Sequence, residues 1–122
     1  MFSIEFYETS AGRSEVFEMI EKLEIRARTS KSDRVRFAKI VEYMRLLEKY
    51  GTLVGFPVVK LIGEDIWELR PQSDRFFFFN AEAQKYVIVH HYKKHGNKMP
   101  QNEFKIAKAH MKDYLERNDD NG

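Results

Sequence analysis

Four consecutive phenylalanines, Phe76 to Phe79, constrain the fold of this chain more than any other feature of its sequence. Successive side chains of a β-strand point to opposite faces of a sheet, so an unbroken apolar run predicts a central strand that is covered on both faces. Such a strand needs neighbouring strands at its edges and other elements packed on its faces. The rest of the chain supplies both.

Strand patterns surround the phenylalanine run. The predicted strands cover residues 58–62, 66–70, 75–80 and 86–92. The breaks between them are short, so neighbouring strands should pair as antiparallel hairpins. A separate short strand is predicted at Phe2–Phe6, where apolar and polar residues alternate.

Helical spacing accounts for most of the remaining residues. A first amphipathic helix is predicted over residues 12–28, and a second should begin after Ser30, whose hydroxyl can cap it, and stop at Gly51. Pro100 suits the first turn of a third helix. The predicted core-facing stripes are Val35, Ala38, Val41 and Leu46, widened by Ile40 and Leu47, in the second helix, and Phe104, Ala107, Met111 and Leu115 in the third.

The order of these elements predicts an α+β fold: a strand, two helices, an antiparallel sheet of about four strands and a C-terminal helix. The 122 residues suit one domain, which we place at residues 1–117, followed by a short acidic tail at 118–122. There is no cysteine, which excludes disulfides and thiolate metal sites. We expect no signal peptide in Met1–Ser10 and no membrane span, because no apolar run approaches the roughly 20 residues required.

Positive charge is concentrated in the last third of the chain. Between Lys85 and Lys112 there are seven lysines and all four histidines, but only one acidic residue, Glu103. A basic surface of this kind suits a polyanion such as nucleic acid. The alternative is that these lysines only keep the surface soluble, and charge alone does not decide between the two.

Two arginines and two lysines should meet at one end of the predicted sheet. Arg70 ends one strand and Arg75 begins the next, while Lys93 and Lys94 end a strand that runs parallel to the first. Four cations in one place suit a phosphate and the charge that grows on it during cleavage. In the alternative interpretation, Arg70 simply forms a salt bridge with Glu68 or Asp74.

The histidines are weaker candidates for chemistry. His90 and His91 are adjacent on a strand, so their side chains should face opposite ways and one should be structural. His95 lies in the following loop and is the candidate acid or base beside the lysines. No pair of histidines has metal-ligand spacing, so we expect neither a metal nor another cofactor. Tyr86 and Tyr92 should face the same way as His90 and could stack on bases.

The chain resembles the RelE/ParE superfamily of toxins, and more closely the phage-derived, HigB-like branch. The motifs that carry the resemblance are Trp67-Glu68-Leu69-Arg70, Asp74 to Phe78, Val87 to Lys94, Pro100 to Phe104 with Ala107, and the earlier Leu46-Leu47 and Tyr50-Gly51. Together these motifs span nearly the whole chain. One departure is Met99, where the branch has a threonine whose hydroxyl would cap the last helix.

The resemblance implies a metal-independent endoribonuclease of the cytoplasm that cleaves messenger RNA, often on the ribosome, through attack of the RNA's own 2′-hydroxyl. It also implies a partner, a helix-turn-helix antitoxin of the HigA kind, and operator DNA bound through the complex. The residues implied in cleavage are Arg70, Arg75, Lys93 and Lys94, to which we add His95. Lys60, Lys98 and Tyr92 are candidate RNA-binding residues.

Two other functions fit the same sequence. A ParE-like toxin would inhibit gyrase and leave RNA intact, although retention of both arginines and the lysine pair argues against it. A non-catalytic nucleic-acid-binding module would use the same basic surface. The identities of the general acid and base, and any codon preference, do not follow from the sequence.

Overall fold

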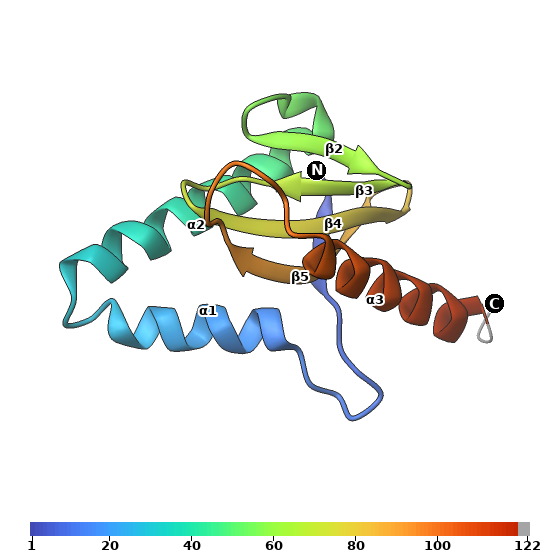
Figure 1. Cartoon of the computed structure of the whole chain (residues 1–122), viewed down its shortest axis with the longest axis horizontal. Helices are drawn as coiled ribbons and strands as arrows, with labels where there is room; N and C mark the ends of the chain where they lie inside the picture. Colours follow the sequence, from blue (N-terminus) through green and yellow to red (C-terminus); the bar gives the residue numbers. More distant parts are fainter. Residues whose placement is uncertain (120–122) are drawn as a thin grey trace.

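The computed structural model describes residues 1–119, which form one sheet with helices on both faces (Figure 1). Among these residues the elements follow in the order β1 (Ser3–Phe6), α1 (Glu15–Arg26), α2 (Lys31–Tyr50), the short 3-10 helix η1 (Gly51–Val54), β2 (Val59–Gly63), β3 (Ile66–Leu69), β4 (Asp74–Glu82), β5 (Lys85–Lys93) and α3 (Gln101–Asp119). The α+β order predicted from the sequence is confirmed.

The sheet has five strands within the described residues, in the order β1-β5-β4-β3-β2. Strands β2 to β5 form the predicted antiparallel hairpins. The sheet nevertheless has five strands where about four were expected, because the predicted N-terminal strand β1 joins it and runs parallel to β5, with Phe6 opposite Ile88. The alternating residues of β1 predict a strand but carry no information about its partner.

The phenylalanine run occupies the centre of the molecule, as predicted. Phe76 and Phe78 pack into the core beneath α1 and α2, which also contains Leu23 and Ile40. Phe77 and Phe79 face the second core cluster, under α3, with Ala107. The molecule therefore has three layers, and both faces of β4 are buried.

Two predicted helix stripes need correction. In α2 the fully buried residues are Ile40 and Leu47, whereas Val35 and Ala38 are exposed. In α3 the buried side chain near the C-terminus is Tyr114, one position before the exposed Leu115. Hydrophobic spacing identified both helices correctly, but packing against the sheet decides which line of apolar residues in each helix is buried.

Serine hydroxyls cap the first two helices, and α1 is shorter at both ends than the predicted range of residues 12–28. The Ser14 hydroxyl accepts a hydrogen bond from the amide of Phe17 at 3.1 Å, and that of Ser30 accepts one from Asp33 at 3.3 Å. Gly51 ends α2 with a φ of 61°, which favours glycine. Its Cα approaches the Phe2 ring and the Tyr86 hydroxyl so closely that a Cβ there would lie 2.7 Å from each.

A β-bulge interrupts the pairing of β4 with β5. Phe77 lies opposite His90 and Phe78 opposite Ile88, so Val89 is an extra residue in β5. The bulge shifts the alternation of the strand: Tyr86 and Ile88 belong to the core under α1 and α2, whereas Tyr92 belongs to the core under α3. The prediction that Tyr86 and Tyr92 share a face is therefore wrong.

The C-terminal end differs from the predicted tail. Helix α3 continues to Asp119, past residue 118 where the acidic tail was expected to begin. The remainder of that predicted tail, residues 120–122, lies outside the described residues. None of the helices in residues 1–119 combines the length and the apolar character that crossing a membrane requires.

Candidate functional site

A small cleft of about 80 Å³ lies on the α3 side of the sheet, beside the loop that follows β5. The residues that line it are Lys60, Ile62, Glu68, Arg70, Arg75, Tyr92, Lys94, Asn97, Lys98 and Met99. Five of these side chains are cationic, and Glu68 is the one carboxylate among these lining residues. The cleft is therefore built to receive an anion.

The strand pattern explains how these residues meet. Glu68 and Arg70 are two positions apart at the end of β3, so they share a face of the sheet. Tyr92 near the end of β5 and Lys94 just after it are also two positions apart, and Tyr92 lies directly opposite Arg75 of β4. Because β3, β4 and β5 are consecutive hairpins, all of these residues reach the same end of the sheet.

Glu68 is the centre of the cluster. Its side chain is almost completely buried, at 4% exposure. Its carboxylate accepts a hydrogen bond of 2.9 Å from the hydroxyl of Tyr92. Oε1 of Glu68 also lies 3.4 Å from Nε of Arg70 and 3.8 Å from Nε of Arg75. A buried carboxylate is thus held by two cations and a phenol.

Tyr92 is held in its protonated form. Burial, together with the negative charge of Glu68 and the hydrogen bond to it, raises the pKa of Tyr92 well above its ordinary value of 10. The hydroxyl therefore keeps its proton at any physiological pH and remains a donor to Glu68. Tyr92 fixes the direction of that carboxylate.

Arg75, at the start of β4, is buried, with only 6% exposure. Its Nη1 donates hydrogen bonds to the carbonyl oxygens of Gln72, at 2.6 Å, and Asp74, at 3.0 Å. Burial and the neighbouring positive charge of Arg70 lower the pKa of Arg75 from its ordinary value of 12.5. Arg75 thus joins the turn before β4 to the carboxylate of the cleft.

Arg70 is more open than Arg75 and lies at the rim of the cleft. Its guanidinium carbon is 5.3 Å from the centre of the Phe56 ring. Its Nε lies within ion-pair distance of Glu68, yet within residues 1–119 this buried nitrogen makes no hydrogen bond. The predicted salt bridge to Glu68 is present only as a loose contact, so Arg70 keeps hydrogen-bonding capacity for a ligand.

The structure brings together most of the residues predicted from the sequence. Arg70, Arg75 and Lys94 line the cleft, as do Lys60, Lys98 and Tyr92. Two predicted residues do not line it. Lys93 is exposed one position before Lys94, so strand alternation directs it to the other face of the sheet, and His95 is exposed in the loop.

Sequence reasoning overlooked Glu68 as the centre of the site. It was considered only as a salt-bridge partner that would neutralise Arg70. A signal was present: Glu68 alternates with Trp67 and Leu69, which places it on the same face as Arg70. Asn97 and Met99 were also missed, because the path of the loop after β5 has no sequence signature.

Asp74, the other predicted partner of the arginines, belongs to a different network on the opposite face. Arg36 of α2 donates two hydrogen bonds to its carboxylate, at 2.9 and 2.7 Å, and Nε2 of His91 lies 2.7 Å from Oδ1. Burial acts to raise the pKa of Asp74, but the hydrogen bonds from Arg36 and His91 outweigh it and lower the pKa to about 2. This network fastens α2 to β4 and β5.

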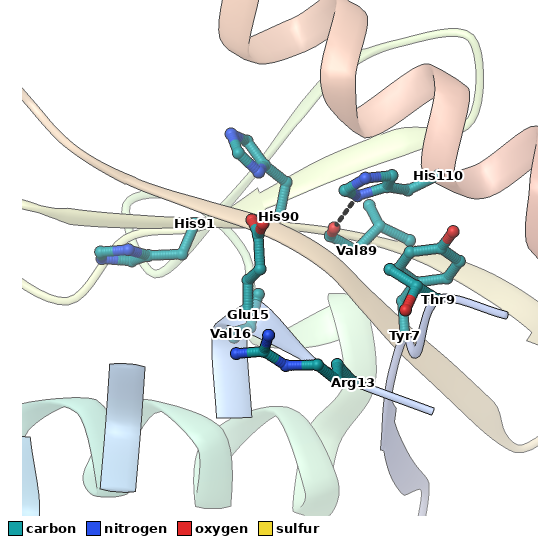
Figure 2. Close-up of a pocket in the computed structure, with 9 residues that line it drawn as sticks. All are labelled: Tyr7, Thr9, Arg13, Glu15, Val16, Val89, His90, His91 and His110. Atoms are coloured by element: carbon teal, nitrogen blue, oxygen red, sulfur yellow. Dashed lines mark hydrogen bonds between the residues drawn. The ribbon is translucent and has the colours of Figure 1, made fainter. Parts of the chain in front are cut away.

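Three histidines line a second cavity, of about 180 Å³, near the edge of β5 (Figure 2). Nε2 of His90 lies 2.6 Å from Glu103 of α3, and His91 contacts Asp74 on the other face. Nδ1 of His110 lies 2.7 Å from the carbonyl oxygen of Val89, the bulge residue. Each ring is therefore engaged in holding elements together.

The chemistry available in the cationic cleft follows from its side chains. A carboxylate can accept a proton, and the surrounding guanidinium and ammonium groups can bind a phosphate and stabilise additional negative charge on it. Among residues 1–119, no group of three or more histidine, aspartate or glutamate side chains is arranged to hold a metal ion.

Comparison with known proteins identifies a family. Residues 27–112 match the family described as "Phage derived protein Gp49-like (DUF891)". That stretch runs from the end of α1 into α3 and contains every residue that lines the cationic cleft. No curated protein matches the chain.

Proposed function

Since the chain belongs to the Gp49-like, phage-derived family, a toxin-like family related to the RelE-type toxins, we propose that it is the toxin of a type II toxin–antitoxin pair and acts as an endoribonuclease. It inhibits translation by cleaving messenger RNA, and it does so on the ribosome. The cytoplasm is the compartment in which this activity would operate.

The observation that carries this proposal is the buried carboxylate of Glu68 within a cleft of five cations. RNA cleavage without a cofactor needs a base near the 2′-hydroxyl and positive charge around the phosphate. Glu68, Arg70 and Lys94 supply both within one small space. A module that only bound nucleic acid would gain nothing from a carboxylate at the centre of its anion site.

The proposed reaction is a transesterification within the RNA. The Glu68 carboxylate takes the proton of the 2′-hydroxyl, and the 2′-oxygen attacks the adjacent phosphorus atom. The bond from phosphorus to the 5′-oxygen of the next nucleotide breaks, and that oxygen takes up a proton. The products are a 2′,3′-cyclic phosphate and a free 5′-hydroxyl.

The other residues of the cleft have separate roles in this reaction. Arg70 and Lys94 bind the non-bridging oxygens, whose charge grows in the transition state. Arg75 and Tyr92 hold Glu68 in position. His95 remains our candidate for the proton donor to the leaving oxygen, because its loop forms one wall of the cleft. Lys60 and Lys98 attract the flanking phosphates.

The proposed partners follow from the toxin role. A cognate antitoxin, of the helix-turn-helix HigA kind, neutralises the chain, and the complex binds operator DNA through the antitoxin. The messenger RNA is presented by the ribosome.

The test is cleavage of a defined messenger RNA by the purified protein, with and without translating ribosomes. We expect shortened RNA that ends in a 2′,3′-cyclic phosphate. Glu68→Gln keeps the shape of the side chain but removes the base, so cleavage should fall at least about 100-fold. Glu116→Gln, which changes the same charge on the exposed face of α3, is the control. Intact RNA with the wild-type protein contradicts the proposal.

The two rival functions make different predictions in the same preparation. A gyrase inhibitor would block supercoiling by gyrase and leave messenger RNA intact, and a binding module would retain RNA without cutting it. We expect the wild-type chain to leave supercoiling unchanged. In cells, expression of the wild-type chain alone should stop growth and shorten messenger RNA, whereas Glu68→Gln should do neither.

A further inference from the structure

Phe56 is an exposed aromatic side chain at the rim of the cationic cleft. Its side chain is 73% exposed, which is unusual for a large apolar ring. It lies in the turn between η1 and β2, where the amides of Val58 and Val59 both donate to the carbonyl oxygen of Gly55 at 3.1 Å. The ring therefore stands on a hydrogen-bonded turn.

Arg70 connects this ring to the cleft. Its guanidinium carbon lies 5.3 Å from the centre of the Phe56 ring, and its Nε lies 3.4 Å from Oε1 of Glu68. The amide of Arg70 also donates to the carbonyl oxygen of Val58, at 2.9 Å, which fastens the turn to the end of β3. An open aromatic ring thus borders the cations that would hold a phosphate.

We propose that Phe56, with the guanidinium of Arg70 beside it, is a stacking platform for one nucleobase of the RNA whose phosphate lies in the cleft. This proposal rests on the proposed function and names a subsite for its substrate. Aromatic rings and arginine planes are the groups on which proteins stack unpaired bases. The larger face of a purine gives more stacking area, so the platform favours a purine over a pyrimidine.

A docked protein is the competing explanation for an exposed phenylalanine. Such a partner would also cover Leu53, which is 93% exposed three residues earlier in the same connection. A nucleobase stacks on a flat aromatic ring, and the leucine side chain has none. Leu53→Ala is therefore a matched control, since it removes an even more exposed apolar side chain from the same segment.

The experiment uses an oligonucleotide with 2′-O-methyl groups throughout, which lacks the attacking hydroxyl and cannot be cleaved. One position carries 2-aminopurine, whose fluorescence is quenched when the base stacks. The oligonucleotide is offered to the full chain both free and in the decoding site of a ribosome. Quenching and dissociation constants are measured for wild type, Phe56→Ala, Phe56→Trp and Leu53→Ala.

We expect the wild-type chain and Leu53→Ala to bind with quenching at one position of the oligonucleotide. Phe56→Ala should lose the quenching and bind roughly ten-fold more weakly, while Phe56→Trp restores both. Equal quenching by Phe56→Ala overturns the platform alone and leaves the proposed function standing. If Leu53→Ala weakens oligonucleotide binding as much as Phe56→Ala does, the platform is overturned and a docked protein is favoured. Absence of binding by the wild-type chain in both settings overturns the proposed function as well.

Discussion

Arg75 is charged and yet almost fully buried, so its replacement should affect folding before it affects catalysis. Arg75→Ala would remove one of the two cations near the buried Glu68 and leave the Gln72 and Asp74 carbonyl oxygens without a donor. We expect a loss of about 3 kcal/mol in the free energy of unfolding, measured with urea.

Arg70→Ala is the comparison for this prediction. Arg70 is more exposed and its Nε makes no hydrogen bond within residues 1–119, so we expect a loss of only about 1 kcal/mol. If the two variants unfold at the same urea concentration, Arg75 contributes less to the free energy of unfolding than we expect.

Lys93, the last residue of β5, and Lys94, which follows it, carry the same charge but differ in their position relative to the cleft. Lys94 lines the cleft and Lys93 does not. We therefore expect Lys94→Gln to reduce cleavage strongly and Lys94→Arg to retain most of it, because the contribution is positive charge near the phosphate. Lys93→Gln should cleave RNA at close to the wild-type rate, measured in the same ribosome assay.

The dependence of cleavage on salt concentration shows whether Lys94 mainly binds the RNA or mainly stabilises the transition state. If Lys94 mainly attracts the RNA, the difference between Lys94→Gln and wild type should shrink at high salt. If Lys93→Gln and Lys94→Gln lose the same share of the cleavage rate, the two lysines contribute only through their total charge. The position of Lys94 in the cleft would then not matter.

At this scale the sequence predicted which residues approach the cleft but not which way each one faces. Strand ends placed Arg70, Arg75 and Lys94 correctly, because hairpin connectivity decides where strands end. The orientation of Tyr92 relative to Tyr86 depends on the Val89 bulge, which has no sequence signature. Glu68 was visible in the alternation of β3, but its importance depends on burial, which a single sequence does not give.

Among the elements, the connection from α2 to the sheet depends on Gly51. A Cβ at this position would lie 2.7 Å from the Phe2 ring and from the Tyr86 hydroxyl, which accepts a hydrogen bond from the amide of Thr52. Gly12 also has a positive φ, of 79°, but an added Cβ there would meet no heavy atom within 4 Å. The two glycines therefore share the backbone requirement and differ in packing.

We expect Gly51→Ala to cost at least about 2 kcal/mol more than Gly12→Ala in the free energy of unfolding. Thermal melting followed by circular dichroism measures the difference. Similar melting temperatures for the two variants would show that the chain relaxes around the extra methyl group and that the close approach at Gly51 is unimportant.

Element boundaries were predictable wherever one side chain or one backbone conformation decides them. The Ser30 cap and the Gly51 stop act locally, so both were readable from the sequence, whereas the Ser14 cap was not predicted and the first helix was expected to begin at residue 12. The buried face of α2 was only partly readable, because both Val35 and Ile40 are apolar and only the sheet chooses between them.

For the molecule as a whole, Asp74 makes the free energy of unfolding fall at acid pH. The hydrogen bonds from Arg36 and His91 lower its pKa in the folded state to about 2, below the ordinary value of 3.8. The stabilisation is therefore complete above about pH 4 and is lost as the pH falls toward 2. A shift of this size corresponds to about 2 kcal/mol.

Asp74→Asn should reveal this link. We expect it to be less stable than wild type by about 2 kcal/mol at pH 7, with a difference that shrinks as the pH falls below 4, measured by urea unfolding at each pH. Glu82→Gln, at an exposed position of the same strand, should leave the pH profile unchanged. A difference that stays constant down to pH 2 would mean that the carboxyl is not held ionised.

The overall architecture was predictable because the phenylalanine run requires cover on both faces and short turns impose antiparallel neighbours. The place of β1 was not, because its partner lies some eighty residues away and parallel pairing leaves no trace in the strand itself. Only the assembled sheet shows that the first strand lies beside the last one.

The pairing of β1 with β5 has a consequence for folding during translation. The ribosome synthesises β1 first, yet the strand that β1 pairs with is the last strand made, so β1 waits without a partner until residues 85–88 have left the exit tunnel. Five of the ten residues that line the cleft, from Tyr92 to Met99, also lie in β5 or after it. A nascent chain halted before β5 therefore has neither the partner strand of β1 nor a complete cleft.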